Sequence, residues 1–263
     1  MFVILVPVFL YEDSLSMIGI IGYGMVGSAV AHAFQQTEKI ISDPAFNNIT
    51  VRDVCSSDPM AIFISVPTPT DDTDYSLLKS ILRQIKDSGY RGLTVVKSTV
   101  LPQHLEGFDV LYNPEFLSRA TAVSDFISPV YVIIGGNRAQ ELLDLYNIYS
   151  LVDTTNTYLL DIPTACLVKY TMNAFFATKV TFMNQMHEIA QKMGADFDAV
   201  SSIVKTHPWI GSNHVSVPGP DGKHGFGGPC LPKDTLALTK EYQLELLNTV
   251  VKLNNQYRKE NGN

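Results

Sequence analysis

Cysteine is scarce in this sequence. Among 263 residues there are three cysteines, Cys55, Cys166 and Cys230, and they are widely spaced. An odd and scattered set forms neither the disulfide framework of a small secreted domain nor a CxxC metal pair, so no metal site is expected. We therefore expect a reducing compartment and place the protein in the cytoplasm.

The sequence also has no excess of positive charge. Its 19 lysines and arginines are outnumbered by 26 aspartates and glutamates, for a formal net charge of −7. Binding to nucleic acid or to an anionic membrane normally requires a basic surface. Neither partner is expected, although a local basic pocket could still bind a phosphorylated small molecule.

No apolar run is long enough to cross a bilayer. The apolar N-terminus falls short of the roughly 20 residues that a span requires, and it lacks the basic start and small-residue cleavage site of a signal peptide. We interpret residues 1–16 as an extension upstream of an alternative start at Met17. An anchor on the membrane surface is the competing interpretation.

Short β-type runs alternate with helical patterns from Met17 to about residue 155. This alternation predicts an α/β domain, residues 17–155, with a doubly wound parallel sheet and helices on both faces. The predicted strands are MIGII, KIISD, AIFISVP, LTVVKS, DVLYN and VYVIIGG.

The sequence pattern changes in residues 156–263, which we expect to form a helical second domain. One helical pattern begins at Pro163, in the first turn, and ends at the capping glycine Gly194. About 30 residues make a helix of roughly 45 Å, long enough to lie against another domain or subunit. Residues 205–229 are expected to be an ordered functional loop, and residues 234–257 a final helix.

A glycine motif lies between the first predicted strand and helix. Gly22, Gly24 and Gly27 form GxGxxG, and Asp43 ends the second strand. Such glycines allow a tight turn, let a pyrophosphate approach the backbone and bring helix against strand, while the carboxylate accepts from ribose hydroxyls. This favours NAD over NADP. The alternative is a tight turn beside an unrelated surface Asp. The expected cofactor contacts in this segment are Gly22, Tyr23, Gly24, Met25, Val26, Gly27 and Asp43.

The segment GFGGPCLPKD contains the residue best suited to nucleophilic chemistry. Pro232 fits the first turn of a helix, which places Cys230 at the helix N-terminus with Lys233 nearby. Both features favour the thiolate and predict a pKa below the usual value of about 8.5. Asp234, one turn on, could position a water molecule. The alternative is an inert buried cysteine beside an Asp that complements the helix dipole.

Polar side chains recur along one face of the long predicted helix. Lys169 and Asn173 are four residues apart, and Asn184 returns to nearly the same face. A lysine and an amide facing a cleft can stabilise a developing alkoxide. A solvated stripe is the alternative.

Further polar residues follow the predicted strands, at the carboxyl edge of the sheet where open α/β folds bind ligands. They are Thr68 and Thr70 in VPTPT, Thr99 in KSTVLP and Glu115 in NPEFL. Each could be ordinary turn chemistry, since Asn-Pro and Thr-Pro commonly end strands. Their shared edge predicts a single site.

Taken together, these motifs resemble the UDP-glucose dehydrogenase family of nucleotide-sugar dehydrogenases. GYGMVG, VPTPT, KSTVLP, NPEFL, the K-x-x-x-N helix and GFGGPCLPKD occur in the family's order, over about residues 17–245. The resemblance implies a Rossmann domain followed by a long-helix central domain, homodimerisation through that helix, and four-electron oxidation of a nucleotide sugar by NAD through a cysteine thioester. UDP-glucose, GDP-mannose and N-acetylated nucleotide sugars stay open as substrates.

The resemblance also implies roles for individual residues. Cys230 would be the nucleophile, Lys169 and Asn173 would stabilise the oxyanion, and Glu115 would be the base for hydrolysis. Thr99 and Asp234 would hold the water. Additional cofactor contacts would come from Thr68, Thr99 and Lys233, and substrate contacts from Glu115, Phe116, Leu117, Lys169, Asn173, Gly225, Phe226 and Gly227.

The sequence departs from the family pattern in several places. Arg119 replaces a glutamate, Trp209 stands where an arginine is common, and Gln185 replaces a frequent glutamate. Members of the family continue into a further domain that binds the nucleoside diphosphate, and we expect that domain to be absent here.

Two other functions remain open from the sequence. One is an inactive NAD-binding remnant that acts with a full-length partner. The other is a β-hydroxyacid dehydrogenase, which shares the architecture and a K-x-x-x-N pair but gives GFGGPC no role.

Overall fold

The chain forms two compact units in a computed structural model that describes residues 16–68 and 75–260. The first unit comprises the described residues up to Val66, residues 80–98 and residues 107–160. The second comprises the described part of 67–79, residues 99–106 and the described residues from Asp161 onward. Helix α3 (Ser76–Ser88) contributes to both units, so they interleave along the chain.

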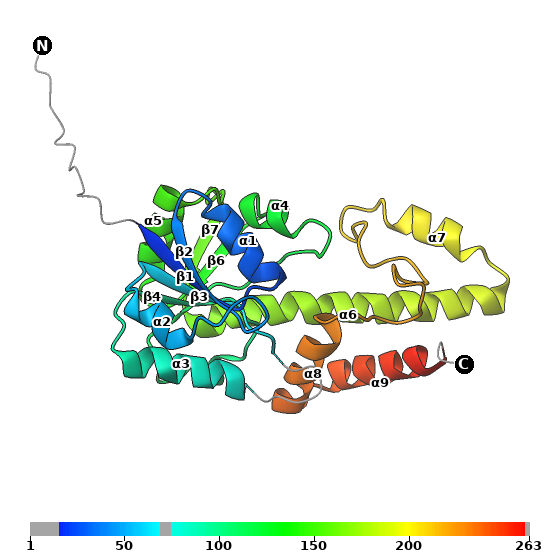
Figure 1. Cartoon of the computed structure of the whole chain (residues 1–263). Coiled ribbons are helices and arrows are strands. Elements are labelled where there is room, and N and C mark those ends of the chain that lie inside the picture. The colour runs from blue at the N-terminus through cyan, green and yellow to red at the C-terminus, as the bar shows by residue number, and fades with distance from the viewer. Residues whose placement is uncertain (1–15, 69–74, 261–263) are drawn as a thin grey trace, which may run out of the picture. The chain divides into compact units, whose positions relative to one another are not determined.

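The first unit is built on a seven-stranded sheet with the order β2-β1-β3-β4-β5-β6-β7 (Figure 1). Neighbouring strands are parallel except β5 and β6, which meet antiparallel at Tyr112 and Gly135. The doubly wound α/β class is confirmed, with one antiparallel pair in a sheet expected to be wholly parallel. The strands are β1 (Met17–Ile21), β2 (Glu38–Ser42), β3 (Ala61–Ile64), β4 (Leu93–Val96), β5 (Leu111–Tyr112), β6 (Val132–Gly135) and β7 (Thr157–Leu160).

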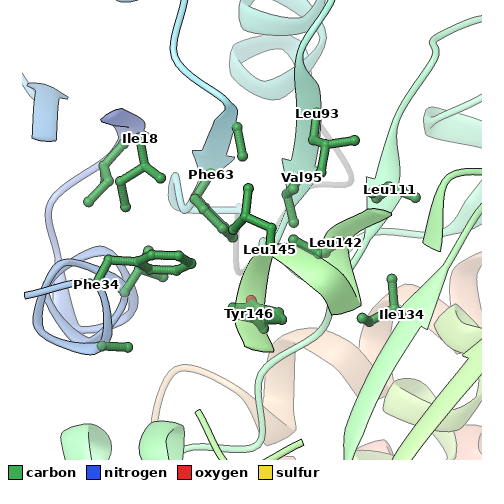
Figure 2. Close-up of a cluster of buried hydrophobic side chains, with 14 of the residues drawn as sticks. Ile18, Phe34, Phe63, Leu93, Val95, Leu111, Ile134, Leu142, Leu145 and Tyr146 are labelled. Atoms are coloured by element: carbon green, nitrogen blue, oxygen red, sulfur yellow. The ribbon is translucent and has the colours of Figure 1, made fainter. Parts of the chain in front are cut away.

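Burial explains why the central strands read as continuous apolar runs. Every residue of β3, β4 and β6 is buried, as expected for parallel strands covered on both faces. The helices of this unit are α1 (Met25–Ala33), α2 (Val51–Ser56), α4 (Ala122–Ile127) and α5 (Ala139–Tyr149). Phe34, Phe63 and Tyr146 form an aromatic centre of the core, with ring centroids 5.4–6.1 Å apart (Figure 2).

Strand β7 was not identified from the sequence. It is a short strand at one end of the sheet, and its middle residues, Tyr158 and Leu159, are exposed. A short, half-exposed strand lacks both the buried run and the regular alternation on which prediction depends.

The second unit is helical. Its elements are η1 (Pro102–His104), α6 (Ile162–Met193), α7 (Phe197–Val204), α8 (Leu231–Tyr242) and α9 (Glu245–Glu260). The predicted long helix is confirmed. Asp161 caps its start by accepting from the Thr164 N–H, and Gly194 ends it with a φ of 67°. Helices α8 and α9 pack against α6 and against each other.

The prediction of one final helix was wrong. Two helices, α8 and α9, occupy this stretch, and Gln243 between them adopts a left-handed conformation with a φ of 48°. Its N–H donates to the Thr239 carbonyl and ends α8. The apolar periodicity continues through the break, so the pattern alone does not reveal it. No helix in the described part of the chain is long and apolar enough to span a membrane.

Candidate active site and cofactor site

The glycine loop shows why each of its glycines is required. Gly22 has a φ of +88°, and a Cβ there would lie 2.6 Å from the Ser65 carbonyl oxygen. A Cβ on Gly27 would lie 2.0 Å from the Gly22 carbonyl oxygen. At Gly24, by contrast, no heavy atom of the described chain lies within 4 Å of the Cβ position. Two glycines therefore serve the fold, while the middle one leaves the backbone open to a ligand.

Helix α1 begins within this motif, with Gly24 as its N-cap and Met25 and Val26 in its first turn. The first N–H groups of a helix have no intrahelical partners and attract anions. The loop follows β1, next to the point where the strand order reverses between β1 and β3. Ligands of open α/β sheets bind at such a switch point.

Asp43 lies against the glycine loop. Its carboxylate accepts from the Tyr23 N–H at 2.6 Å and from the Ala45 N–H at 2.8 Å. The Tyr23 ring contacts Phe46, with 4.7 Å between centroids. A carboxylate can accept about four hydrogen bonds, so these two leave room for ribose hydroxyls. The carboxylate is thus fixed beside the loop, as a dinucleotide site requires.

The segment after β5 places Glu115 in the first unit. Its carboxylate accepts from the Leu117 N–H at 2.7 Å, and the Phe116 ring packs edge-on against Tyr131. Asn113, just before, accepts from the Lys97 ammonium and the Tyr146 hydroxyl, each at 2.7 Å. This buried network holds the carboxyl ends of β4 and β5 together.

The predicted site threonines do not lie in the same unit as Glu115. Thr68 and Thr99 follow β3 and β4 in sequence, yet both belong to the second unit. Thr99 is buried. Thr70 lies outside the described residues.

Cys230 is the N-cap residue of α8, and Pro232 lies in the first turn. The predicted position of the cysteine at a helix N-terminus is confirmed. Its thiol is half-buried, whereas Cys55 and Cys166 are buried. Burial raises the pKa of the Cys166 thiol to about 12, which keeps it protonated. Cys230 is therefore the cysteine whose setting suits a nucleophile.

Asp234 joins α8 to α6. Its side chain is 1% exposed, and its two oxygens accept from Asn173 and from Lys233, each at 2.5 Å. The Asp234 N–H donates to the Cys230 carbonyl. Lys169, one turn before Asn173, is 3% exposed. The polar stripe on α6 is thus buried at Lys169 and Asn173, not solvated, and it faces the helix that carries the cysteine.

Tyr75 and Tyr170 also lie near Asp234, and the sequence analysis did not identify them. Their hydroxyls are 3.4 Å apart. Burial raises the pKa of Tyr75, and the negative charge of Asp234 adds to this effect. No short motif marks either tyrosine.

The glycine-rich loop before Cys230 is held by side chains from two helices. Asn184 of α6 accepts from the Gly225 N–H at 3.0 Å, and Asn254 of α9 accepts from the Phe226 N–H at 2.6 Å. Arg258 of α9 donates to the carbonyls of both loop residues, at 2.9 and 3.0 Å. Asn184 was identified from the sequence as part of the stripe. Asn254 and Arg258 were missed, since they lie beyond the motif.

Residues where the sequence departs from the family pattern lie on the surface. Trp209 is 93% exposed, and Arg119 and Gln185 are exposed. The predicted site residues divide between the two units. The first unit contains the glycine loop, Asp43 and the Glu115–Leu117 segment. The second unit contains Cys230, Asp234, Lys233, Lys169, Asn173 and Thr99.

Comparison with known proteins provides independent evidence on the family of this chain. Residues 45–153 match the UDP-glucose/GDP-mannose dehydrogenase family, NAD binding domain, and residues 163–257 match the same family's central domain. The first match begins after the glycine loop, so the role of that loop rests on its geometry and position.

Individual relatives agree. The chain is 34% identical over 235 residues to a UDP-glucose 6-dehydrogenase of Rickettsia conorii, covering 80% of this chain and 52% of the relative. It is 32% identical over 221 residues to a GDP-mannose 6-dehydrogenase of Pseudomonas savastanoi pv. phaseolicola, covering 73% and 49%. The chain spans about half the length of the curated relatives it matches.

A solved structure gives the same result. A UDP-glucose dehydrogenase from the archaeon Pyrobaculum islandicum superposes with a TM-score of 0.77 and 25% identity, covering 96% of this chain and 70% of that one. NAD is the cofactor of the matched N-terminal domain. The chain belongs to the UDP-glucose/GDP-mannose dehydrogenase family.

Proposed function

We propose that this chain catalyses the NAD-dependent four-electron oxidation of a nucleotide sugar, with UDP-glucose oxidised to UDP-glucuronate as the first reaction to test. Residues 17–155 would bind NAD, and residues 156–263 would carry the catalytic cysteine and the dimer interface. The relatives' names supply the substrate class.

One observation carries the proposal. A half-buried cysteine occupies the N-cap position of α8, and one turn further on a buried carboxylate is bound by the amide of Asn173 and the ammonium of Lys233. A purely structural helix start does not require a buried ion pair, whose desolvation often outweighs its attraction. A site that must hold water and stabilise charge near a thiolate does require such groups.

The first unit offers the features that NAD needs. The open backbone at Gly24 and the N-terminus of α1 suit a pyrophosphate, and Asp43 beside the loop suits the ribose hydroxyls and disfavours a 2′-phosphate. When bound, NAD accepts the hydride removed from the sugar. Thr68, Thr99 and Lys233 are proposed as further contacts.

The proposed reaction balances in three stages. First, C6 of the sugar alcohol loses a hydride and its hydroxyl loses a proton, which gives an aldehyde. The Cys230 thiolate then adds to the aldehyde carbon, and the oxygen, stabilised by Lys169 and Asn173, gains a proton. Loss of a second hydride and of that proton converts the thiohemiacetal into a thioester, so the sugar has given up four electrons to two NAD.

Water completes the cycle. Thr99 and Asp234 are proposed to hold the water molecule, and Glu115 to accept its proton as the oxygen bonds to the acyl carbon. The C–S bond then breaks, and Cys230 leaves as the thiolate together with the free acid. Gly225, Phe226, Gly227, Phe116 and Leu117 are proposed to contact the substrate.

The long helix supports a homodimer. Phe175, Phe182 and Ile189 are 61%, 54% and 45% exposed and follow one another at seven-residue intervals. Such spacing places them on one face, and exposed apolar stripes of this kind are typical of helix pairing. A Phe182→Glu variant is expected to be monomeric in analytical ultracentrifugation, whereas a change at the exposed Gln185 leaves the dimer intact.

The proposed function is tested with purified protein, NAD and a panel of nucleotide sugars, counting NADH formed per sugar consumed. We expect two NADH per sugar with at least one substrate, loss of this complete oxidation in Cys230→Ala, and retention in Cys55→Ala. Bound NAD without NADH from any sugar would instead support an inactive cofactor-binding protein that acts with a full-length partner.

A further inference from the structure

The loop from Gly225 to Gly227 precedes Cys230, and both apolar and polar contacts hold it in place. The Phe226 side chain is 4% exposed and packs in a cluster with Ala177 and Val250, and Leu231, next to the cysteine, joins the same cluster. These apolar contacts anchor the side chain in the middle of the loop and the first residue of α8. They leave the orientation of the backbone between them to polar contacts.

Those polar contacts come from three side chains, Asn184, Asn254 and Arg258, which we call the loop clamp. Asn184 and Asn254 are 1% and 5% exposed. Each uses its amide oxygen to accept from a loop N–H, while Arg258 donates to the loop carbonyls. The N–H and C=O groups of both Gly225 and Phe226 are therefore bound by side chains of distant helices.

Arg258 also forms an ion pair with a residue that precedes the loop. Its Nη1 donates to the Asp221 carboxylate at 2.6 Å, while Nε and Nη2 contact the loop carbonyls at 3.0 and 2.9 Å. The planar guanidinium distributes donors in fixed directions, which a lysine cannot do. One side chain thus ties three points of the loop region together.

Two glycines of the loop are needed because the clamp approaches so closely. A Cβ on Gly227 would lie 2.7 Å from Nη2 of Arg258, and a Cβ on Gly225 would lie 2.5 Å from Oδ1 of Asn254. The glycines and the clamp are therefore one arrangement, in which the backbone is pressed against the polar side chains of α9.

We propose that Arg258 and Asn254 of α9 are positioning residues that hold the Gly225–Gly227 backbone for the sugar and thereby place the substrate against Cys230. The proposal rests on the proposed function for its kinetic consequence. The loop geometry itself is independent of it. Displacing a catalytic group by about 1 Å can reduce rate by about a hundredfold, so the clamp is expected to matter although it touches no reacting atom.

The test compares Arg258→Gln with Lys259→Gln, which removes the same charge from the next, exposed position of α9. We expect Arg258→Gln to lower kcat/KM for the nucleotide sugar at least about tenfold, with KM for the sugar raised and KM for NAD unchanged. General destabilisation would not change one KM selectively. Lys259→Gln is expected to match the wild type.

Asp221→Asn separates the ion pair from the loop contacts. Because it leaves both carbonyl contacts of Arg258 in place, it is expected to retain most of the activity. Arg258→Lys keeps the positive charge but loses the planar set of guanidinium donors, so its activity is expected to fall as much as that of Arg258→Gln. If Arg258→Gln does not fold, Arg258→Lys is used for the test instead. Impairment in Asp221→Asn equal to that in Arg258→Gln would overturn the positioning role.

Trypsin cleavage after the exposed Lys223 provides a readout that needs no turnover. The Arg258 variants are expected to be cut there faster than Lys259→Gln, as followed by mass spectrometry. Equal cleavage rates would overturn the proposal whether or not the wild type oxidises a sugar. Faster cleavage without wild-type turnover would support the clamp and count against the proposed function alone.

Discussion

Two glycine-rich loops of this molecule lead into helix N-termini, and they are held in different ways. The loop Gly22–Gly27 is tightened by backbone against backbone, with Gly27 packed on the Gly22 carbonyl. The loop Gly225–Gly228 is held by side chains that come from positions 28 to 41 residues away in sequence. The geometry of the first loop is thus determined within its own motif, whereas that of the second depends on the packing of α6 and α9 beside it.

This difference predicts different responses to added side chains. A Gly27→Ala substitution places a Cβ 2.0 Å from a backbone oxygen that cannot turn aside. We expect the free energy of unfolding to fall by about 3 kcal/mol, the upper end for overpacking, together with loss of NAD binding. Gly24→Ala, where the Cβ is unobstructed, is expected to keep its stability and still bind NAD more weakly. Urea unfolding and NAD titration measure both, and undiminished affinity in Gly24→Ala would contradict the proposed pyrophosphate approach.

In the second loop the obstacle is a side chain, so a smaller loss is expected. Gly225→Ala meets the Asn254 amide at 2.5 Å with a φ of +72°, whereas Gly228, with a φ of +77°, has nothing within 4 Å in the described chain. We expect about 2 kcal/mol of destabilisation for the first and about 1 kcal/mol for the second, which is the backbone penalty alone. Equal losses in the free energy of unfolding for the two variants, measured by urea unfolding, would mean that Asn254 moves aside without cost.

The buried thiol of Cys166 makes the stability of the fold depend on pH in the alkaline range. Burial raises the pKa of Cys166 to about 12, while an unfolded thiol ionises near about 8.5. Its contribution to stability is full below the unfolded pKa and is lost as the pH rises toward the folded value. Cys166→Ala is expected to flatten the alkaline decline of the free energy of unfolding between about pH 8.5 and 12. An unchanged decline would contradict this. In the wild type at pH 8, iodoacetamide is expected to label Cys230 and not Cys166.

The sequence was informative where structure is local. The strand–glycine loop–helix start, the long helix with its Asp161, Pro163 and Gly194 signals, and the cysteine before Pro232 each depend on neighbours within a few residues, and the structure confirms their placement. The spacing of Lys169 and Asn173 placed them on one helix face, and only the structure shows that this face is buried at both residues and not solvated.

The rest depends on contacts that no local pattern encodes. The break at Gln243 interrupts a periodicity that continues across it, and the half-exposed strand β7 owes its place to the edge of the sheet. Asn254 and Arg258 acquire their role only because α9 packs beside the loop. Glu115 and Cys230 belong to different units, and their cooperation in hydrolysis remains a proposal.

The decisive measurement is the mass of the Cys230 peptide after acid quench of a reaction with UDP-glucose and NAD. Because Glu115 is proposed to activate the hydrolytic water, the Glu115→Gln variant should accumulate the thioester. We predict that its Cys230 peptide gains the mass of the acylated nucleotide sugar, while the peptides of Cys55 and Cys166 stay unmodified. Production of the acid without any adduct on Cys230, at quench times shorter than one turnover, would contradict the account.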